Sequence, residues 1–150
     1  MLGPVRLVTF ALRALVVVVA LAILWPAVAE PYNRGLVYLA RPLTPELSIK
    51  VLGSHILFDG PDLASSVSID ALTLHFGVVL MAVLVLAAVG LGVLPRLVSL
   101  AVLGSGAFLL HVVGVALLGR GMIWASSPGS PASSGDLVFS LFAVFWGLLP

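Results

Sequence analysis

The sequence predicts a membrane protein that is mainly α-helical, with three to four transmembrane helices and a small extracytoplasmic loop that holds a short helix and a β-hairpin. Two observations predict this class. Apolar residues make up 61% of the 150 residues and charged residues only 9%, whereas soluble domains are about half apolar and about a quarter charged. The apolar residues also gather in long runs, several of them near the ~20 residues that cross a bilayer as a helix.

Composition also excludes several classes of function. The net charge is +1 and the seven Lys and Arg residues are scattered, so no basic run predicts nucleic-acid binding. The chain has no cysteine, which removes disulfides, zinc-thiolate sites and a thiol nucleophile. The sequence contains no glycine-rich phosphate loop, no Ser-His-Asp spacing and no HExxH motif. We therefore expect no enzymatic activity and no cofactor or metal site.

Residues 1–29 form the first transmembrane helix or a signal-like anchor. The apolar run from Leu7 to Trp25 follows Arg6 and includes Arg13, whose long side chain reaches back toward the headgroups. The Ala-Val-Ala triplet that ends at Ala29 also has the small-x-small form of a signal-peptidase site. We expect the segment to be retained, and cleavage after Ala29 is the alternative.

Residues 30–71 are expected to form the extracytoplasmic loop. Pro31 suits the first turn of a helix, and Arg41-Pro42 ends the apolar run that follows. Together with two tyrosines, this run predicts a short helix at the membrane interface, with an irregular loop as the alternative.

A β-hairpin is expected over Ser48–Gly60. Gly53-Ser54 suits a two-residue type II′ turn, which pairs Leu52 with His55 and each earlier residue with a later one. The stretch 66–71 alternates polar and apolar residues and predicts a third strand. This pairing gives the hairpin an apolar face that must pack on the helices or on a partner, and we expect it to be partner-facing: Ile49, Val51, Ile56 and Phe58.

Residues 72–118 predict a transmembrane helical hairpin. Two apolar runs, Leu72–Leu94 and Leu97–Leu118, flank Pro95-Arg96, which is expected to form the turn. Residues 119–136 include the Ser/Gly/Pro-rich stretch of a flexible linker. Residues 137–150 form a short C-terminal membrane segment, about 21 Å long as a helix against a core of about 30 Å, which either enters the membrane partway, begins before residue 137 or has lost its end.

The positions of the arginines predict sidedness. Arg6 and Arg13 precede or begin the first span, and Arg96 lies in the short connection between later spans. Short cationic elements stay on the cytoplasmic side. We therefore expect a multi-pass protein of the bacterial inner (plasma) membrane, with a cytoplasmic amino terminus, and with membrane lipid and a membrane protein as partners.

Two histidines inside the expected spans are the candidate functional residues. His111 lies on a helix face with small residues that let another helix approach closely: Gly104, Ala107 and Gly114. With His75, it has the chemistry to ligate haem iron or to relay protons. The favoured alternative is hydrogen bonding between neighbouring helices, because two histidines without a supporting motif are a weak haem signal.

Three stretches, Trp25-Pro26, GSHILFDG at residues 53–60 and IDALTLHFG at residues 69–77, occur in an order that resembles small membrane proteins associated with exosortases. The resemblance implies a leading span, an outward β-containing loop, a helical bundle and a role in protein sorting at the bacterial envelope. Exosortases themselves resemble cysteine transpeptidases, so a chain without cysteine is not that enzyme. The resemblance therefore implies an accessory or assembly subunit of an envelope complex.

Overall fold

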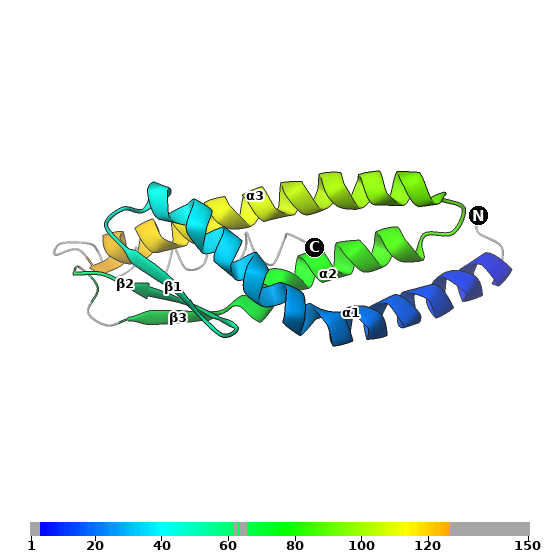
Figure 1. Ribbon diagram of the computed structural model, residues 1–150, viewed down its shortest axis with the longest axis horizontal. Helices are drawn as coiled ribbons and strands as arrows, with labels where there is room; N and C mark the ends of the chain where they lie inside the picture. Colours follow the sequence, from blue (N-terminus) through cyan, green and yellow to red (C-terminus); the bar gives the residue numbers. More distant parts are fainter. Residues whose placement is uncertain (1–3, 62, 64–65, 127–150) are drawn as a thin grey trace.

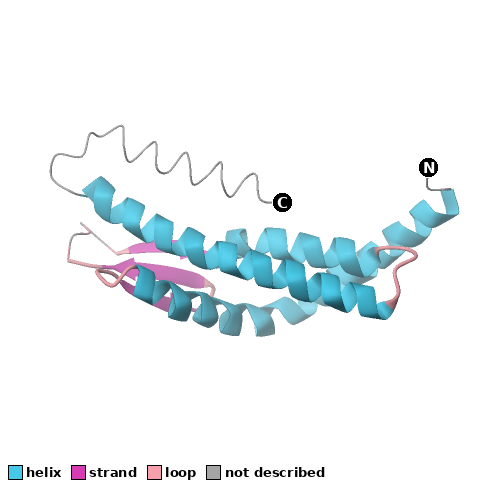
Figure 2. Cartoon of the chain, turned by 90° about the horizontal axis from the view of Figure 1, so that it is seen from above, coloured by secondary structure: helices cyan, strands magenta, loops and turns pink. Residues whose placement is uncertain are grey.

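The computed structural model describes residues 4–61, 63 and 66–126. Within these ranges three helices run along the long axis, with a small sheet at one end (Figure 1). The start of α1 and the connection between α2 and α3 lie at the opposite end, and Figure 2 shows the same arrangement from above. The elements in chain order are α1 (Pro4–Ala40), η1 (Arg41–Leu43), β1 (Ser48–Leu52), β2 (His55–Asp59), β3 (Val67–Asp70), α2 (Ala71–Ala87) and α3 (Val93–Ser126).

The first helix is longer than expected. α1 is one helix of 37 residues that contains Pro26 and Pro31, so the expected first span and the expected interfacial helix are a single element. A proline inside a helix removes one backbone hydrogen bond and kinks the axis. Figure 1 shows α1 changing direction in its middle. The helix continues because its last turns are buried against the sheet and α3.

The hairpin register is confirmed. Ser48 pairs with Asp59, and the pairing continues to Leu52 opposite His55. Gly53 has a φ of 59°, the positive value that the first central residue of a type II′ turn needs. β3 adds to β2 in antiparallel register. The sheet therefore has the order β1-β2-β3.

The connection between α2 and α3 differs from the expectation. α2 ends at Ala87 and α3 begins at Val93, so Pro95 and Arg96 lie in the first turn of α3 and are not the turn. Proline is tolerated there because the first N–H groups of a helix have no partner within it. The Arg96 guanidinium Nη2 donates to the carbonyl of Ala88 over 2.7 Å and ties the new helix to the end of α2.

The third helix continues beyond Leu118. α3 reaches Ser126 and therefore includes residues 119–126 of the expected linker. Arg120 donates from Nε to the carbonyl of Leu43 over 3.1 Å, which joins this last part of α3 to η1. The remainder of the expected linker and the segment 137–150 lie outside the described residues.

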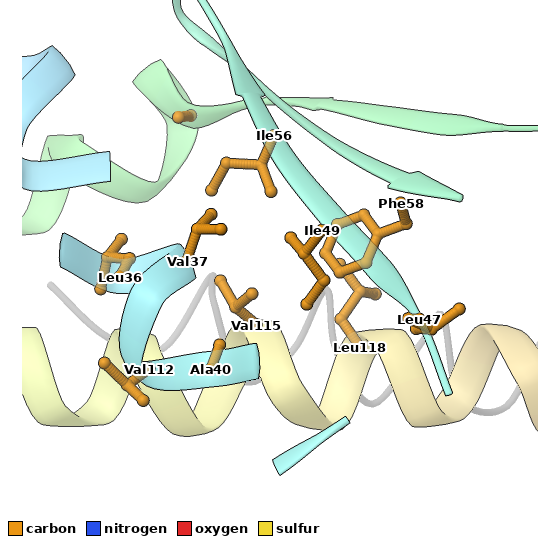
Figure 3. Close-up of a cluster of buried hydrophobic side chains, with 11 residues drawn as sticks. Leu36, Val37, Ala40, Leu47, Ile49, Ile56, Phe58, Val112, Val115 and Leu118 are labelled. Carbon is orange, nitrogen blue, oxygen red and sulfur yellow. The ribbon is translucent and has the colours of Figure 1, made fainter. Parts of the chain in front are cut away.

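A single apolar core joins the sheet to the helices. β1 and β2 turn one face toward the last turns of α1 and the second half of α3, and Figure 3 shows their side chains sharing one space. Burying this face stabilises a small sheet that would be marginal alone. The buried members are Leu36, Val37, Ala40, Leu47, Ile49, Ile56, Phe58, Ala71, Val112, Val115 and Leu118.

Among the described residues, two helices are long and apolar enough to cross a membrane. They are Val5–Leu43 and Val93–Trp124. α2 has 17 residues and a shorter apolar part, His75–Ala87. The described residues thus form a mostly helical chain with two helices of membrane length and a small three-stranded sheet. The three to four transmembrane helices stay a prediction, because residues 137–150 lie outside the described residues.

Candidate functional site

The three helices meet around two buried histidines. His75 from α2 is 2% exposed and His111 from α3 is 5% exposed. α1 supplies their polar neighbours, because Trp25, Tyr32 and Asn33 all face this junction. These five residues are called the polar cluster below.

The hydrogen bonds of His75 fix its tautomer. The indole Nε1 of Trp25 donates to His75 Nδ1 over 3.0 Å, and an indole nitrogen has no other role. His75 Nδ1 is then the acceptor, so the proton of the neutral ring is on Nε2 and is donated to Asn33 Oδ1 over 2.9 Å. This arrangement also fixes the orientation of the Asn33 amide. If the amide were flipped, its NH2 group would face Nε2 of His75, and both ring nitrogens would then have to accept a hydrogen bond. A neutral imidazole has only one acceptor nitrogen, so the flipped orientation is excluded.

Tyr32 connects the two histidines. Its hydroxyl lies 2.7 Å from Nδ1 of His111. Its ring meets His75 edge-on at 5.1 Å and Phe108 at 5.2 Å, with His111 at 6.0 Å between centroids. Edge-to-face contacts of this kind add stabilisation beyond the buried area. Tyr32 therefore contacts residues of both α2 and α3.

The geometry favours a structural role for His75. A histidine binds a metal through an unprotonated nitrogen, and the unprotonated nitrogen of His75 accepts the Trp25 hydrogen bond. Ligating haem or accepting a relayed proton would break that bond. No group of three His, Cys, Asp or Glu side chains in the described part of the chain is arranged to hold a metal ion. These contacts are the interhelical hydrogen bonds of the favoured alternative.

One polar atom of the cluster is left over. Asn33 is fully buried, and its Nδ2 has no hydrogen-bond partner among the described residues. A buried donor without an acceptor costs about 1–3 kcal/mol. The polar cluster therefore stabilises the helix junction less than a fully paired network would.

The small-residue face of α3 turns inward only in part. Gly104 and Ala107 are half-buried, while His111 and Gly114 are buried. A methyl group added to Gly104 would meet no described atom within 4 Å, so none of the described helices approaches closely there. Close approach occurs instead at Gly119, where an added methyl would lie 2.8 Å from Leu47 Cδ1.

The apolar face of the hairpin packs on the protein's own helices. Ile49, Ile56 and Phe58 are at most 1% exposed, and Val51 is half-buried. The first three lie against α1 and α3 (Figure 3) and are not available to a partner in this arrangement. The opposite face of the sheet is the accessible one.

Sequence reasoning missed Trp25, Tyr32, Asn33 and Phe108 as members of this junction. Trp25 and Tyr32 are seven residues apart, which places them on one face if the helix is continuous. Treating Pro26 and Pro31 as boundaries hid that spacing.

Comparisons of the chain with protein-family models, with curated proteins and with solved structures gave no match. The features of the protein that bear on its function are therefore the exposed apolar surface of the helices, the polar cluster and the accessible face of the sheet.

Proposed function

We propose that the protein is a multi-pass protein of the bacterial inner membrane that acts as a non-enzymatic accessory or assembly subunit of an envelope complex. One observation carries the membrane part. The most apolar 18-residue stretch of Val5–Leu43 has no buried residue, and 33% of that of Val93–Trp124 is buried. A core helix of a soluble protein would bury most of such a stretch. Lipid is the solvent that suits these exposed apolar surfaces.

The distribution of charge supports the sidedness. Arg6 and Arg13 lie in the first part of α1, and Arg96 lies beside the connection between α2 and α3. These parts share the end of the molecule opposite to the sheet (Figure 1). By the positive-inside rule this end is cytoplasmic and the sheet is extracytoplasmic.

The accessory role is supported by the way the sheet packs on the helices with one face and leaves the other face exposed. Its inner face is fixed to α1 and α3, whereas the outer face presents Lys50, Leu52, His55 and Asp59 to solvent. Leu52 is 67% exposed. A rigid, accessible face that combines apolar and charged side chains suits contact with another protein. Protein sorting, implied by the resemblance to exosortase-associated proteins, is the process we propose for the complex.

Sidedness can be tested by labelling introduced cysteines, because the chain contains no cysteine of its own that would react with the label. Single cysteines replace Ser54 in the hairpin turn and Leu91 in the connection between α2 and α3, both of them exposed. A membrane-impermeant maleimide should label Ser54→Cys in intact spheroplasts and Leu91→Cys only after lysis. Equal labelling of both positions in intact spheroplasts contradicts the sidedness.

A second test addresses the accessory role. The full chain is purified in mild detergent, and the membrane protein that accompanies it is quantified. Leu52→Asp should reduce that partner at least fivefold, whereas Leu43→Asp, an exposed leucine outside the sheet, should retain it. Equal retention in both variants contradicts a docking role for the sheet. A haem absorption band that disappears in His111→Leu would place the protein in the redox class instead.

A further inference from the structure

A groove between the end of α1 and the edge strand β1 gathers three cations. It has a volume of about 430 Å³. We call it the basic groove, and its lining residues are Arg34, Val37, Tyr38, Arg41, Lys50 and Val51. No acidic side chain is among these residues. A concave surface lined by one sign of charge raises the local concentration of ions of the opposite sign.

Arg41 is held in place at the edge of the sheet. Its Nε and Nη2 both donate to the carbonyl of Ile49, over 3.3 Å and 3.1 Å. A guanidinium has five N–H donors, so further donors remain beyond these two bonds. Because residues two apart in a strand turn their backbone groups to the same side, the N–H of Val51 also faces this edge.

Arg34 is available to a ligand at small cost. It pairs with Glu30 one turn earlier on α1, and the two side chains are 72% and 55% exposed. Exposed ion pairs of this kind contribute little to stability. An anion in the basic groove would replace Glu30 at Arg34 with little loss. Lys50, exposed on β1, adds the third charge.

The position of the groove relative to the apolar part of α1 indicates the source of the anion. Val28 is the last large apolar residue exposed before Arg34 on α1, and six residues of helix span about 9 Å. The headgroup layer is about 5–8 Å thick on each side of the hydrocarbon core. The backbone of Arg34 therefore lies at the outer edge of the headgroup layer when α1 crosses a membrane, and its long side chain can reach back to the phosphates. Tyr38, one turn further, is 73% exposed, as is usual for tyrosines at this level.

We propose that the basic groove binds the phosphate of an anionic phospholipid headgroup, with Arg34, Arg41 and Lys50 as the contacting cations. This inference rests on the proposed membrane location. A peptide added to β1 as a further strand is disfavoured, because Arg41 already occupies the edge carbonyl of Ile49. A bound headgroup would fix the sheet against the membrane surface beside the end of α1.

The test measures lipid affinity of the full-length protein in detergent by native mass spectrometry. Phosphatidylglycerol should bind more tightly than phosphatidylcholine. A cation near a membrane surface contributes about 1 kcal/mol, which is about fivefold in affinity. Lys50→Gln should therefore weaken phosphatidylglycerol binding about fivefold, and Arg34→Gln with Lys50→Gln about 25-fold. Neither change touches the apolar core, so unchanged circular dichroism is expected.

Arg120→Gln is the matched control, because it removes one exposed charge at the same end of the molecule outside the groove. It should change the affinity less than twofold. Equal binding of the two lipids, or an equal loss in Lys50→Gln and Arg120→Gln, overturns the proposal. Displacement of the lipid by millimolar inorganic phosphate also overturns it, since the free ion would then be the ligand. A protein that requires detergent but does not distinguish the lipids refutes only the headgroup site, and a protein that is monomeric without detergent refutes the membrane location as well.

Discussion

The indole Nε1 of Trp25 donates to Nδ1 of His75 over 3.0 Å and joins α1 to α2 directly before the proline at position 26. The two residues are 50 positions apart in the sequence. Since the Nε2–H of His75 donates to Asn33 Oδ1, the donors run in one direction, from Trp25 to His75 and from His75 to Asn33. The two hydrogen bonds attach His75 of α2 to α1 at one residue before Pro26 and at one residue after Pro31.

Replacing Trp25 by Phe should destabilise the protein by about 1–3 kcal/mol, because Nδ1 of His75 would be a buried acceptor without a donor. The measurement is the thermal unfolding of the protein in detergent. Trp124→Phe is the control, since Trp124 is 49% exposed near the end of α3, and it should change the stability by less than about 0.5 kcal/mol. Equal effects of the two changes would show that the hydrogen bond to His75 contributes nothing.

Tyr32→Phe separates the hydroxyl of Tyr32 from its ring. The change removes the hydrogen bond to His111 and keeps the edge contacts with His75 and Phe108. We expect a loss of about 1–3 kcal/mol in the free energy of unfolding. Tyr38→Phe, at the exposed tyrosine of α1, should have little effect. A Tyr32→Phe protein as stable as Tyr38→Phe would mean that ring packing alone holds α1 against α3.

The hairpin was predictable because its register depends only on residues that are close together in the sequence. A glycine at the first turn position and alternation on both sides of it define the register from Ser48 to Asp59 without any tertiary information. The burial of Ile49 and Phe58 follows from the same alternation. What local rules left open was the identity of the surface that covers this face. That surface is formed by α1 and α3, which are distant in the sequence.

The helix boundaries were less predictable because a proline can mark the end of a helix, but can also lie inside a helix or in its first turn. The first helix was expected to end near Ala29 and Pro31 to begin a separate short helix, yet both Pro26 and Pro31 lie inside α1, where packing of the last turns outweighs the lost backbone hydrogen bonds. Pro95 indicated a turn, yet it lies in the first turn of α3. The membership of Trp25 and Tyr32 in the polar cluster follows only when α1 is continuous, so the error in the helix boundary also concealed two of its five residues.

Leu47 packs between Gly60 and Gly119, and replacing Gly119 by a larger residue should destabilise the protein. A methyl group added to Gly119 would lie 2.8 Å from Leu47 Cδ1 and 3.4 Å from Phe58 Cε1. On its other side Leu47 lies close to Gly60, where an added methyl group would be 2.8 Å from Cδ2, and Leu47 is itself buried at 7% exposure. Gly119→Ala should therefore destabilise the protein by about 1–3 kcal/mol in thermal unfolding.

Gly104→Ala is the control for this prediction, because it lies in the same helix with no described atom within 4 Å of the new methyl. It should be neutral or stabilising by up to about 1 kcal/mol, the difference between Gly and Ala in a helix. Shortening Leu47 to Ala should also reduce the effect of Gly119→Ala, since the clash involves its side chain. An undiminished effect in the Leu47→Ala background would place the strain elsewhere.

The connection between α2 and α3 depends on the backbone of Gly90. Its φ is 93°, a value that is unfavourable for residues with a Cβ atom. Gly90→Ala should therefore cost about 1–3 kcal/mol, although the added methyl meets no described atom within 4 Å. Gly92→Ala, two residues away, should be nearly neutral. Gly92 is not among the described residues with positive φ, and its methyl would make an ordinary contact of 3.6 Å with Pro95. Thermal unfolding of both variants measures the difference, and equal stability would mean that the connection adopts another backbone conformation in the membrane.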